Sequence, residues 1–434
     1  MIQTLAEITI VGLGPGPAEL RTVAVQQALD GAGQVFVRTH DGIDFSDLLS
    51  RANVTDVLNL RDPRAASGSR WAAATLAICD ATADGPVVLA IPGHPRFGEM
   101  LVAETVEAAR HRGLSVGVLD GISVLDLVST SLGVDPIAES VQLFDARRIA
   151  ALAAECPFAG GRFTGSPRRP MLFTHAYDAT ICTGLHRMLS ALFPAQHPLT
   201  RIEAAGMPGE RISEHTLADL GALGGNVVAF WIPAMEDLEA GTEPRTMQHI
   251  VARLRQPDGC PWDRKQTRES LRKPMIDELY EVVDAIDRGD PAHLAEELGD
   301  LFLLILMQAQ IAHEANEFSI EDVYRGIATK IVGRHPHVFG DAVVETEADL
   351  SGVWAEAKAR EKAVTGDRSG KDVDGEPFSM PALERAARVL KKHPVVADDD
   401  APELLRLVSE IVAAGEDPEA VLRQQLRDHV ARNR

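Results

Sequence analysis

The sequence predicts a multidomain protein in which a two-lobed α/β region is followed by an all-α helical region. Three observations carry this prediction. In the first half, short apolar runs alternate with helical patterns, which is typical of a sheet covered by helices on both faces. From Thr246 to about Gly340 the strand candidates disappear and long helical patterns dominate. The chain has 434 residues, which is too long for one ordinary core and favours two or more domains.

The first lobe is predicted to open with a strand at Ile8–Val11, a glycine-rich turn at Gly12–Gly16 and a helix through Leu20–Leu29. A second helix is expected at Glu99–His111. Since strands and helices alternate, the sheet should be parallel or mixed. Further strands are predicted at residues 86–91 and 115–119 and, in a second lobe, at 171–174 and 226–232.

The helical half is predicted to contain a reversal at Arg288–Pro291, a loop at Val364–Val373, and two last helices near Pro381–Lys392 and Pro402–Arg434. Its second part, Leu404–Arg432, resembles Leu301–Arg334, although short amphipathic helices also resemble one another by chance. The expected organisation is an α/β domain at 1–236, a linker at 237–247, a helical domain at 248–362, and a loop with a degenerate second helical unit at 363–434.

Composition narrows the class of protein. A hydrophobic share of 45% and a charged share of 25% are typical of a globular chain. The formal net charge of −21 argues against nucleic acid as a partner, because phosphate contacts need clustered Lys and Arg. The four cysteines form no CxxC pair, which predicts neither a disulfide framework nor a zinc site and fits a cytoplasmic location.

No membrane or export segment is expected. Met1–Gly12 lacks a basic region followed by a long apolar run. The apolar stretch Leu301–Met307 is far too short to span a bilayer, so we interpret it as part of a buried helix.

Two pairs of acids stand on the neighbouring helices around the predicted reversal. The two acids of each pair are three residues apart, and residues at this spacing share one helical face, with roughly 5–6 Å between Cβ atoms. The reversal lets the two acidic faces converge. Carboxylates on rigid helices suit Mg²⁺, which keeps several waters and is completed by substrate phosphates. The acids are Glu278 and Glu281, then Glu297 and Asp300.

A structural alternative exists for these acids. Acids near helix N-termini can simply satisfy the helix dipole, and a chain with 64 acids produces this spacing by chance. Two pairs on consecutive helices make chance less credible. In addition, Asp300 directly precedes Leu301–Met307, and a carboxylate that enters an apolar bundle needs compensation, which a metal supplies.

Residues 250–362 resemble the MazG-type nucleoside triphosphate pyrophosphohydrolases, an all-α family. The resemblance rests on Leu254–Asp263, on the ExxE…ExxD array, on Lys330–Phe339 and on Trp354 with Lys358. It implies hydrolysis of nucleoside triphosphates to monophosphate and pyrophosphate, with broad specificity and a house-cleaning role. The implied magnesium ligands are Glu278, Glu281, Glu297 and Asp300, and the implied nucleotide-contacting or activating residues are Lys330, Arg334, Trp354 and Lys358. Asp277 stands where the family commonly has Glu, and its role stays open.

The chemistry of the residues agrees with these roles. Lys330 and Arg334 are four residues apart on one helical face and could neutralise phosphate charge. The expected mechanism is in-line attack of a metal-activated water on the α-phosphorus, and Glu281 is the candidate carboxylate that orients or deprotonates the water. We interpret His335 and His337 as turn residues, because Pro336 ends the helix.

The tryptophans have two interpretations. Trp262 and Trp354 are of a type more often found in a core than as platforms for a base, and for Trp354 the motif leaves both alternatives open. Family members form dimers or higher oligomers, so the resemblance also implies a homodimer at least.

Residues 5–235 resemble the tetrapyrrole methylase fold, on Gly12–Gly16, Pro92–Pro95 and Leu132–Pro136. That family binds S-adenosylmethionine between two lobes, which would place Gly12, Gly14, Gly16, Gly93 and His94 at the cofactor. Pro17 and the Gly93-His-Pro95 loop, however, each lack an acid that members often carry. A tight structural turn is the alternative for the glycines, and a binding or regulatory module is the alternative for the domain. For the whole chain, a methyltransferase and a nucleotide-sensing protein are the alternatives to the hydrolase.

Overall fold

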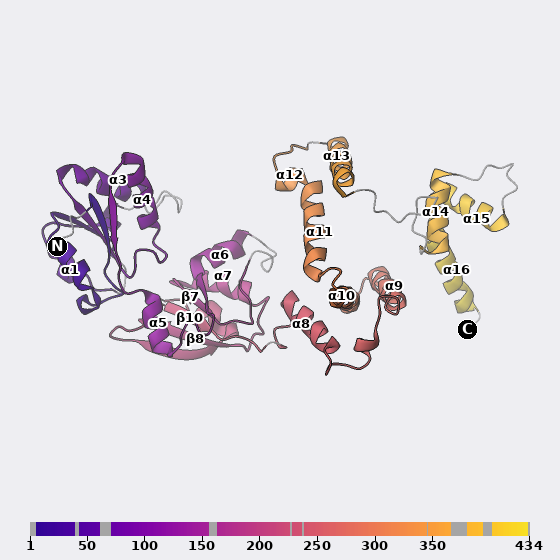
Figure 1. The fold of residues 1–434 in the computed structure, drawn as a ribbon, viewed down its shortest axis with the longest axis horizontal. Helices are drawn as coiled ribbons and strands as arrows, with labels where there is room; N and C mark the ends of the chain where they lie inside the picture. The colour runs from indigo at the N-terminus through magenta and orange to yellow at the C-terminus, as the bar shows by residue number, and fades with distance from the viewer. Residues whose placement is uncertain are drawn as a thin grey trace. The chain divides into compact units, whose positions relative to one another are not determined.

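The computed structural model has the predicted fold class, with two α/β sheets followed by helices alone (Figure 1). Contacts divide the chain into two compact units, Met1–Ala315 and Asn316–Arg434. Among the described helices, none is both long and apolar enough to cross a membrane. The domain boundaries stay predictions. The structure describes residues 6–39, 43–60, 71–155, 163–225, 228–236, 238–344, 346–365, 380–393 and 402–432.

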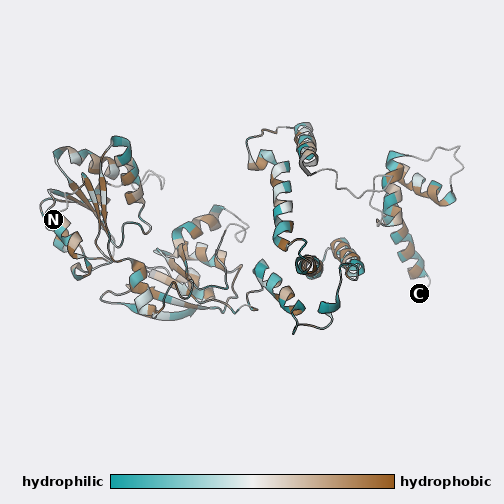
Figure 2. Ribbon diagram, viewed as in Figure 1, coloured by the Kyte–Doolittle hydropathy of each residue, from teal (hydrophilic) through white to brown (hydrophobic). Residues whose placement is uncertain are grey.

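The first sheet is parallel throughout, in the order β3-β2-β4-β1-β5. Its central strands β1 and β4 are fully buried, as expected for parallel strands with helices on both faces. Figure 2 shows these strands as mainly hydrophobic. The strands are β1 Ile8–Gly12, β2 Gln34–Val37, β3 Val54–Asp56, β4 Val87–Ile91 and β5 Val116–Leu119.

Two separate cores cover the two faces of this sheet. On one face, Ile78 of α3 and Leu101 of α4 pack with Ile8 and Leu89. On the other face, Leu29 of α1 and Leu48 of α2 pack with strand residues such as Val11. The predicted helix from Leu20 begins instead at Val23, because Thr22 caps it. The helices of this lobe are α1 Val23–Asp30, α2 Ser46–Leu49, α3 Ala72–Ala81 and α4 Met100–Arg112. The next helix, α5 Val124–Leu132, packs against the second sheet, where its Val128 contributes to a core with Leu172 and Ile202.

The second sheet is mixed, in the order β6-β7-β10-β8-β9. β6 pairs with β7 in parallel, and the other pairings are antiparallel. Helices α6 and α7 pack against each other, and their buried residues form one core with Phe173 and Phe230 of the sheet. The elements are β6 Gln142–Asp145, α6 Ala146–Glu155, β7 Met171–Thr174, α7 Ala179–Leu189, β8 Pro198–Glu203, β9 Arg211–Thr216 and β10 Val228–Ile232.

The remaining described elements are helical. Helix α8 begins at Pro244, within the segment predicted as a linker. The single helix predicted at Pro402–Arg434 is wrong, because the chain turns at Gly415, which has a left-handed φ of 81°. Most of the predicted loop Val364–Val373 lies outside the described residues. The helices are α8 Pro244–Arg255, α9 Arg272–Arg288, α10 Pro291–Glu314, α11 Ile320–Arg334, α12 Pro336–Phe339, α13 Glu347–Thr365, α14 Ala382–Lys392, α15 Glu403–Ala413 and α16 Pro418–Arg432.

Candidate functional site

The reversal between α9 and α10 is built by local chemistry. Gly289 ends α9 in the left-handed conformation, with φ 67°. Asp290 then caps α10, because its side chain accepts hydrogen bonds from the backbone N–H groups of Ala292 and His293, both at 3.1 Å. Pro291 occupies the first turn of α10. The two helices therefore follow each other directly and pack together.

This packing brings acids from both helices together. One carboxylate oxygen from each of Glu278, Glu281 and Glu297 lies within 4.8 Å of the others. Glu281 is exposed, Glu278 is half-buried, and Glu297 has an exposed fraction of only 5%. Three oxygens at this separation are a donor set that fits one divalent cation. Three of the four acids selected from the sequence thus form a cluster.

The electrostatics of the cluster are those of like charges held together. Burial raises the pKa of Glu278, and the neighbouring charges of Glu281, Asp300 and Glu297 raise it further. Burial also raises the pKa of Glu297, as do the charges of Glu281 and Asp300, while His293 opposes this shift. Asp300 is therefore close enough to act on the cluster electrically. A bound cation would relieve this repulsion.

Two neighbours of the cluster were not assigned from the sequence. His293 lies one helical turn before Glu297, and its Nδ1 is 3.1 Å from Glu297 Oε1. The spacing of four residues could have indicated this contact. Asp277, whose role was left open, forms an ion pair with Lys273 one turn earlier on α9. Its carboxylate is thereby engaged outside the cluster.

The predicted nucleotide residues lie in the second unit. Lys330 and Arg334 are on α11, and Trp354 and Lys358 are on α13, which contacts α11. The α11 helix ends at Arg334, before Pro336, as predicted. His335 follows it, and its Nδ1 lies 2.7 Å from the carbonyl oxygen of Ile331. Its ring meets the Trp354 ring edge-on, with 5.7 Å between centroids.

The two tryptophans do not belong to a core. Trp354 is exposed, and Trp262 has an exposed fraction of 75%, so the core interpretation of Trp262 is wrong. The loop before α9 is instead held by Arg255, whose Nη1 donates to the carbonyl oxygens of Asp263 and Gln266, at 2.5 and 3.3 Å. The sequence pattern could not distinguish a buried Trp from an exposed one, because a single Trp carries no periodicity.

In the N-terminal domain, the predicted cofactor glycines pack against other parts of the chain. Gly14 and Gly93 pair through their backbones, with N–H to carbonyl distances of 3.3 and 2.7 Å. A Cβ on Gly12 would lie 2.5 Å from the Gly93 carbonyl oxygen, and one on Gly16 would lie 2.6 Å from the Met207 sulfur. Close packing of neighbouring loops therefore accounts for the absence of side chains at Gly12 and Gly16.

His94 is also engaged within the protein. Its Nδ1 accepts a hydrogen bond from the Arg96 N–H at 3.1 Å, and its Nε2 lies 3.3 Å from Asp120. Its ring contacts Phe97 edge-on. Both ring nitrogens thus have partners before any ligand binds.

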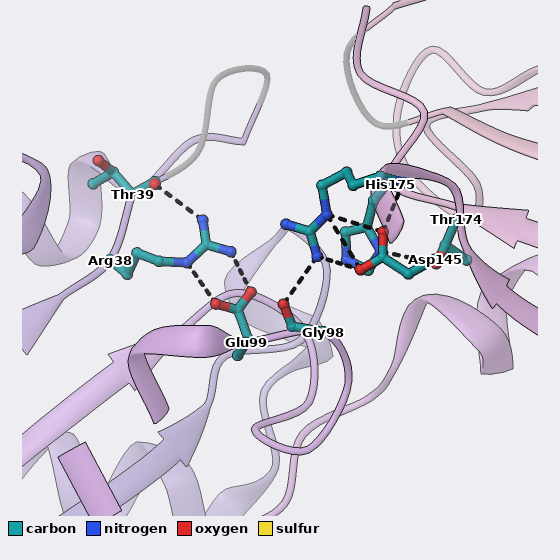
Figure 3. A network of polar contacts seen from close by, with 8 residues as sticks. Arg38, Thr39, Gly98, Glu99, Asp145, Thr174 and His175 are labelled. Atoms are coloured by element: carbon teal, nitrogen blue, oxygen red, sulfur yellow. Dashed lines mark hydrogen bonds and ion pairs between the residues drawn. The ribbon is translucent and has the colours of Figure 1, made fainter. Parts of the chain in front are cut away.

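A polar network joins the two lobes beside this loop (Figure 3). Arg38 donates from Nε to Glu99, at 2.9 Å. From the second lobe, Arg147 donates to Asp145 and, at 3.1 Å, to the carbonyl of Gly98. Gly98 also packs directly against the ring of His175. The charges of the network are paired with each other.

A small cavity lies next to the network, with a volume of about 90 Å³. Pockets for small molecules are usually about 300–1,000 Å³. The lining residues include Pro92, Phe97, Val124 and Tyr177, whose pKa is raised by burial to about 12. The cavity is smaller than that range, and two of the residues predicted at the cofactor, Gly93 and His94, line it.

Each half of the chain matches a known protein family, and the two families are those that the sequence resembles. Residues 7–221 match the Tetrapyrrole (Corrin/Porphyrin) Methylases. Residues 266–339 match the MazG nucleotide pyrophosphohydrolase domain, and this range contains α9, α10 and α11. The chain therefore combines a tetrapyrrole methylase domain with a MazG domain.

More particularly, the chain belongs to the family of YabN from Bacillus subtilis (strain 168), an uncharacterized protein. The two are 34% identical over 393 residues, which cover 89% of this chain and 76% of YabN. The MazG part is also 42% identical, over 151 residues, to the nucleoside triphosphate pyrophosphohydrolase/pyrophosphatase MazG of Thermotoga maritima; the match covers 35% of this chain and 56% of that protein. The nucleoside triphosphate pyrophosphohydrolase of Escherichia coli (strain K12) is 40% identical over 144 residues, covering 33% and 54%.

Among solved structures, the uroporphyrin-III-C-methyltransferase from Thermus thermophilus matches with a TM-score of 0.39 and 19% identity, over 55% of this chain and 97% of that one.

Proposed function

We propose that this protein hydrolyses nucleoside triphosphates to nucleoside monophosphates and pyrophosphate, in a magnesium-dependent reaction. One observation carries the proposal: carboxylates from two consecutive helices converge within 4.8 Å, inside the segment that matches the MazG domain. Relatives of that segment in Thermotoga maritima and Escherichia coli bear the name of this activity. A house-cleaning role with broad specificity follows from the same likeness.

The proposed magnesium ligands are Glu278, Glu281 and Glu297, with Asp300 as a fourth acid beside them. The donor set consists only of carboxylate oxygens, which hard cations prefer. The raised pKa values of Glu278 and Glu297 support the assignment, because burial and the charges of the neighbouring acids disfavour the ionised carboxylates until a cation binds. When bound, magnesium supplies positive charge that stabilises the phosphate oxygens of the substrate.

The remaining work of catalysis falls to side chains. Glu281 is the most accessible acid of the cluster, so we assign it the role of orienting a water and accepting its proton. The water oxygen forms a bond to the α-phosphorus while the bond to the departing pyrophosphate oxygen breaks. Neither a covalent enzyme intermediate nor a redox step is needed.

The nucleotide would be recognised by residues of the second unit. We assign Lys330, Arg334 and Lys358 to the negative charge of the phosphate chain. Trp354 has an exposed ring, supported on one side by His335, and is a candidate platform for the base. These roles rest on the motif and on the side-chain chemistry.

We also propose that the protein acts as a homodimer or higher oligomer. Large apolar side chains on α9 and α10 are exposed, among them Leu279, Ile286 and Leu298. Exposed apolar surface of this kind is typical of an interface with another chain. Size-exclusion chromatography with light scattering tests this, and a monomer at micromolar concentration would contradict it.

The function is tested with the full chain, MgCl₂ and each nucleoside triphosphate in turn. Pyrophosphate and orthophosphate are measured separately, together with the nucleotide product. Pyrophosphate with monophosphate is the expected result. Orthophosphate with diphosphate would overturn the proposal, as would binding without turnover, which is the behaviour of a sensor.

Calorimetry with S-adenosylmethionine tests the methyltransferase alternative, and we expect no binding.

A further inference from the structure

His293 stands apart from the other histidines described here because of the group that it touches. Its Nδ1 lies 3.1 Å from Oε1 of Glu297. The two groups form an ion pair when the imidazole is protonated. Among the acids that the structure describes, Glu297 has the smallest exposed fraction, 5%. The imidazole therefore supplies a partner to a charge that would otherwise be costly to bury.

A second His–Glu pair with the same spacing lies on the surface and serves for comparison. On α4, His111 lies 2.9 Å from Glu107, also one helical turn away. Both of those side chains are exposed, and such surface pairs contribute little because water screens them. The α10 pair differs in burial and in surroundings, since Glu297 also belongs to the cluster with Glu278 and Glu281.

The contact has a geometric consequence for Glu297. With Oε1 beside the imidazole of His293, the carboxylate of Glu297 loses rotational freedom. His293 itself is anchored by its position, because its backbone N–H is bonded to the cap residue Asp290. The turn that reverses the chain thus also fixes the residue that orients the buried ligand. Hydrogen bonds from outside the ligand set commonly orient metal ligands in this way.

We propose that His293 is a positioning residue of the magnesium site, which holds Glu297 in the orientation needed for metal binding. This inference rests on the proposed function, in that it takes the carboxylate cluster as the metal site. It assigns His293 no contact with the nucleotide and no part in proton transfer. Its effect is on the affinity for the metal.

The test compares His293→Ala and His293→Asn with the wild-type chain. Mn²⁺ binding without nucleotide is measured by electron paramagnetic resonance, and the Mg²⁺ dependence of pyrophosphate release is measured in parallel. Loss of an outer partner of this kind typically lowers metal affinity by about 10- to 100-fold. We expect this loss for His293→Ala, with a matching rise in the Mg²⁺ concentration for half-maximal rate and little change in kcat at saturation. His293→Asn should recover part of the affinity, because its amide can still donate.

His111→Ala is the matched control, since it removes the exposed His–Glu pair of α4. It should leave metal binding unchanged, and a thermal melt of each variant checks folding. Wild-type Mn²⁺ affinity in His293→Ala would overturn the inference, as would a loss confined to kcat or a wild-type chain that binds no metal. Metal binding that depends on His293 in a chain without hydrolysis would contradict the proposed function alone. Hydrolysis with unchanged metal affinity in His293→Ala would contradict only the role of His293.

Discussion

Charged side chains are arranged differently between the two α/β lobes and on the α9–α10 pair. Between the lobes, Arg38 pairs with Glu99 and Arg147 with Asp145, so each charge has an opposite partner. On α9 and α10, acids are brought together, and burial and their like charges raise the pKa of Glu278. A satisfied network stabilises a fold, whereas repulsion maintained on rigid helices indicates where a ligand binds. The clustered acids therefore make the α9–α10 pair, rather than the space between the lobes, the candidate ligand site.

The largest expected effect comes from Glu281→Gln. A metal supplies several kcal/mol of transition-state stabilisation, so loss of a ligand should lower magnesium-dependent pyrophosphate release by about 10³-fold. Asp277→Asn is the control, because Asp277 lies on the same helix but pairs with Lys273. Undiminished turnover of Glu281→Gln would show that the cluster is not catalytic.

Magnesium itself should stabilise the helix pair. At a concentration of 100 times Kd, a ligand that binds only the folded state raises the free energy of unfolding by about 2.7 kcal/mol. Hydrogen exchange of the full chain, with and without MgCl₂, locates the effect. We expect added protection in α9 and α10 and little change in the first sheet, with NaCl of equal ionic strength as the control. Equal added protection in the helix pair and in the first sheet would show that magnesium does not act specifically on α9 and α10.

In the lobes, Gly12→Ala should be harmful for reasons of packing alone. The new methyl group would lie 2.5 Å from the Gly93 carbonyl oxygen and 2.7 Å from the Gly121 nitrogen, both backbone atoms. Overpacking of this kind typically costs about 1–3 kcal/mol of stability. Gly33→Ala is the control, because a Cβ there meets no atom within 4 Å. Urea unfolding measures the difference, and equal stabilities would refute the packing role.

The smallest effect is a dependence of stability on pH. A raised pKa means that Glu278 binds protons more readily in the folded than in the unfolded state, so the contribution of Glu278 to the free energy of unfolding should rise as pH falls from neutral towards the ordinary glutamate value of 4.5. Thermal melts of the wild type and of Glu278→Gln, both without metal, isolate the contribution of Glu278 to the free energy of unfolding. The variant should be the more stable at neutral pH, and the difference should shrink on acidification. A difference that grows on acidification would have the wrong sign.

Sequence pattern predicted much of the fold because burial periodicity is local. The run Val87–Ile91 is apolar throughout, as a strand buried on both faces requires, and this strand was predicted to within one residue. The reversal at Gly289 and Asp290 was likewise readable from the residues. Pattern failed at Gly415, where one helix was predicted and the chain turns, and at Trp262, whose exposure depends on what lies around it.

The sequence by itself determined that acids spaced three apart on two consecutive helices could face each other, because helical periodicity and the short turn leave little freedom. Only the tertiary structure decided that Glu297 is buried and that it joins Glu278 and Glu281 in one cluster. It likewise decided that Gly14 and Gly93 bond to each other. Burial and partner choice depend on residues far apart in the chain, which a local pattern does not contain.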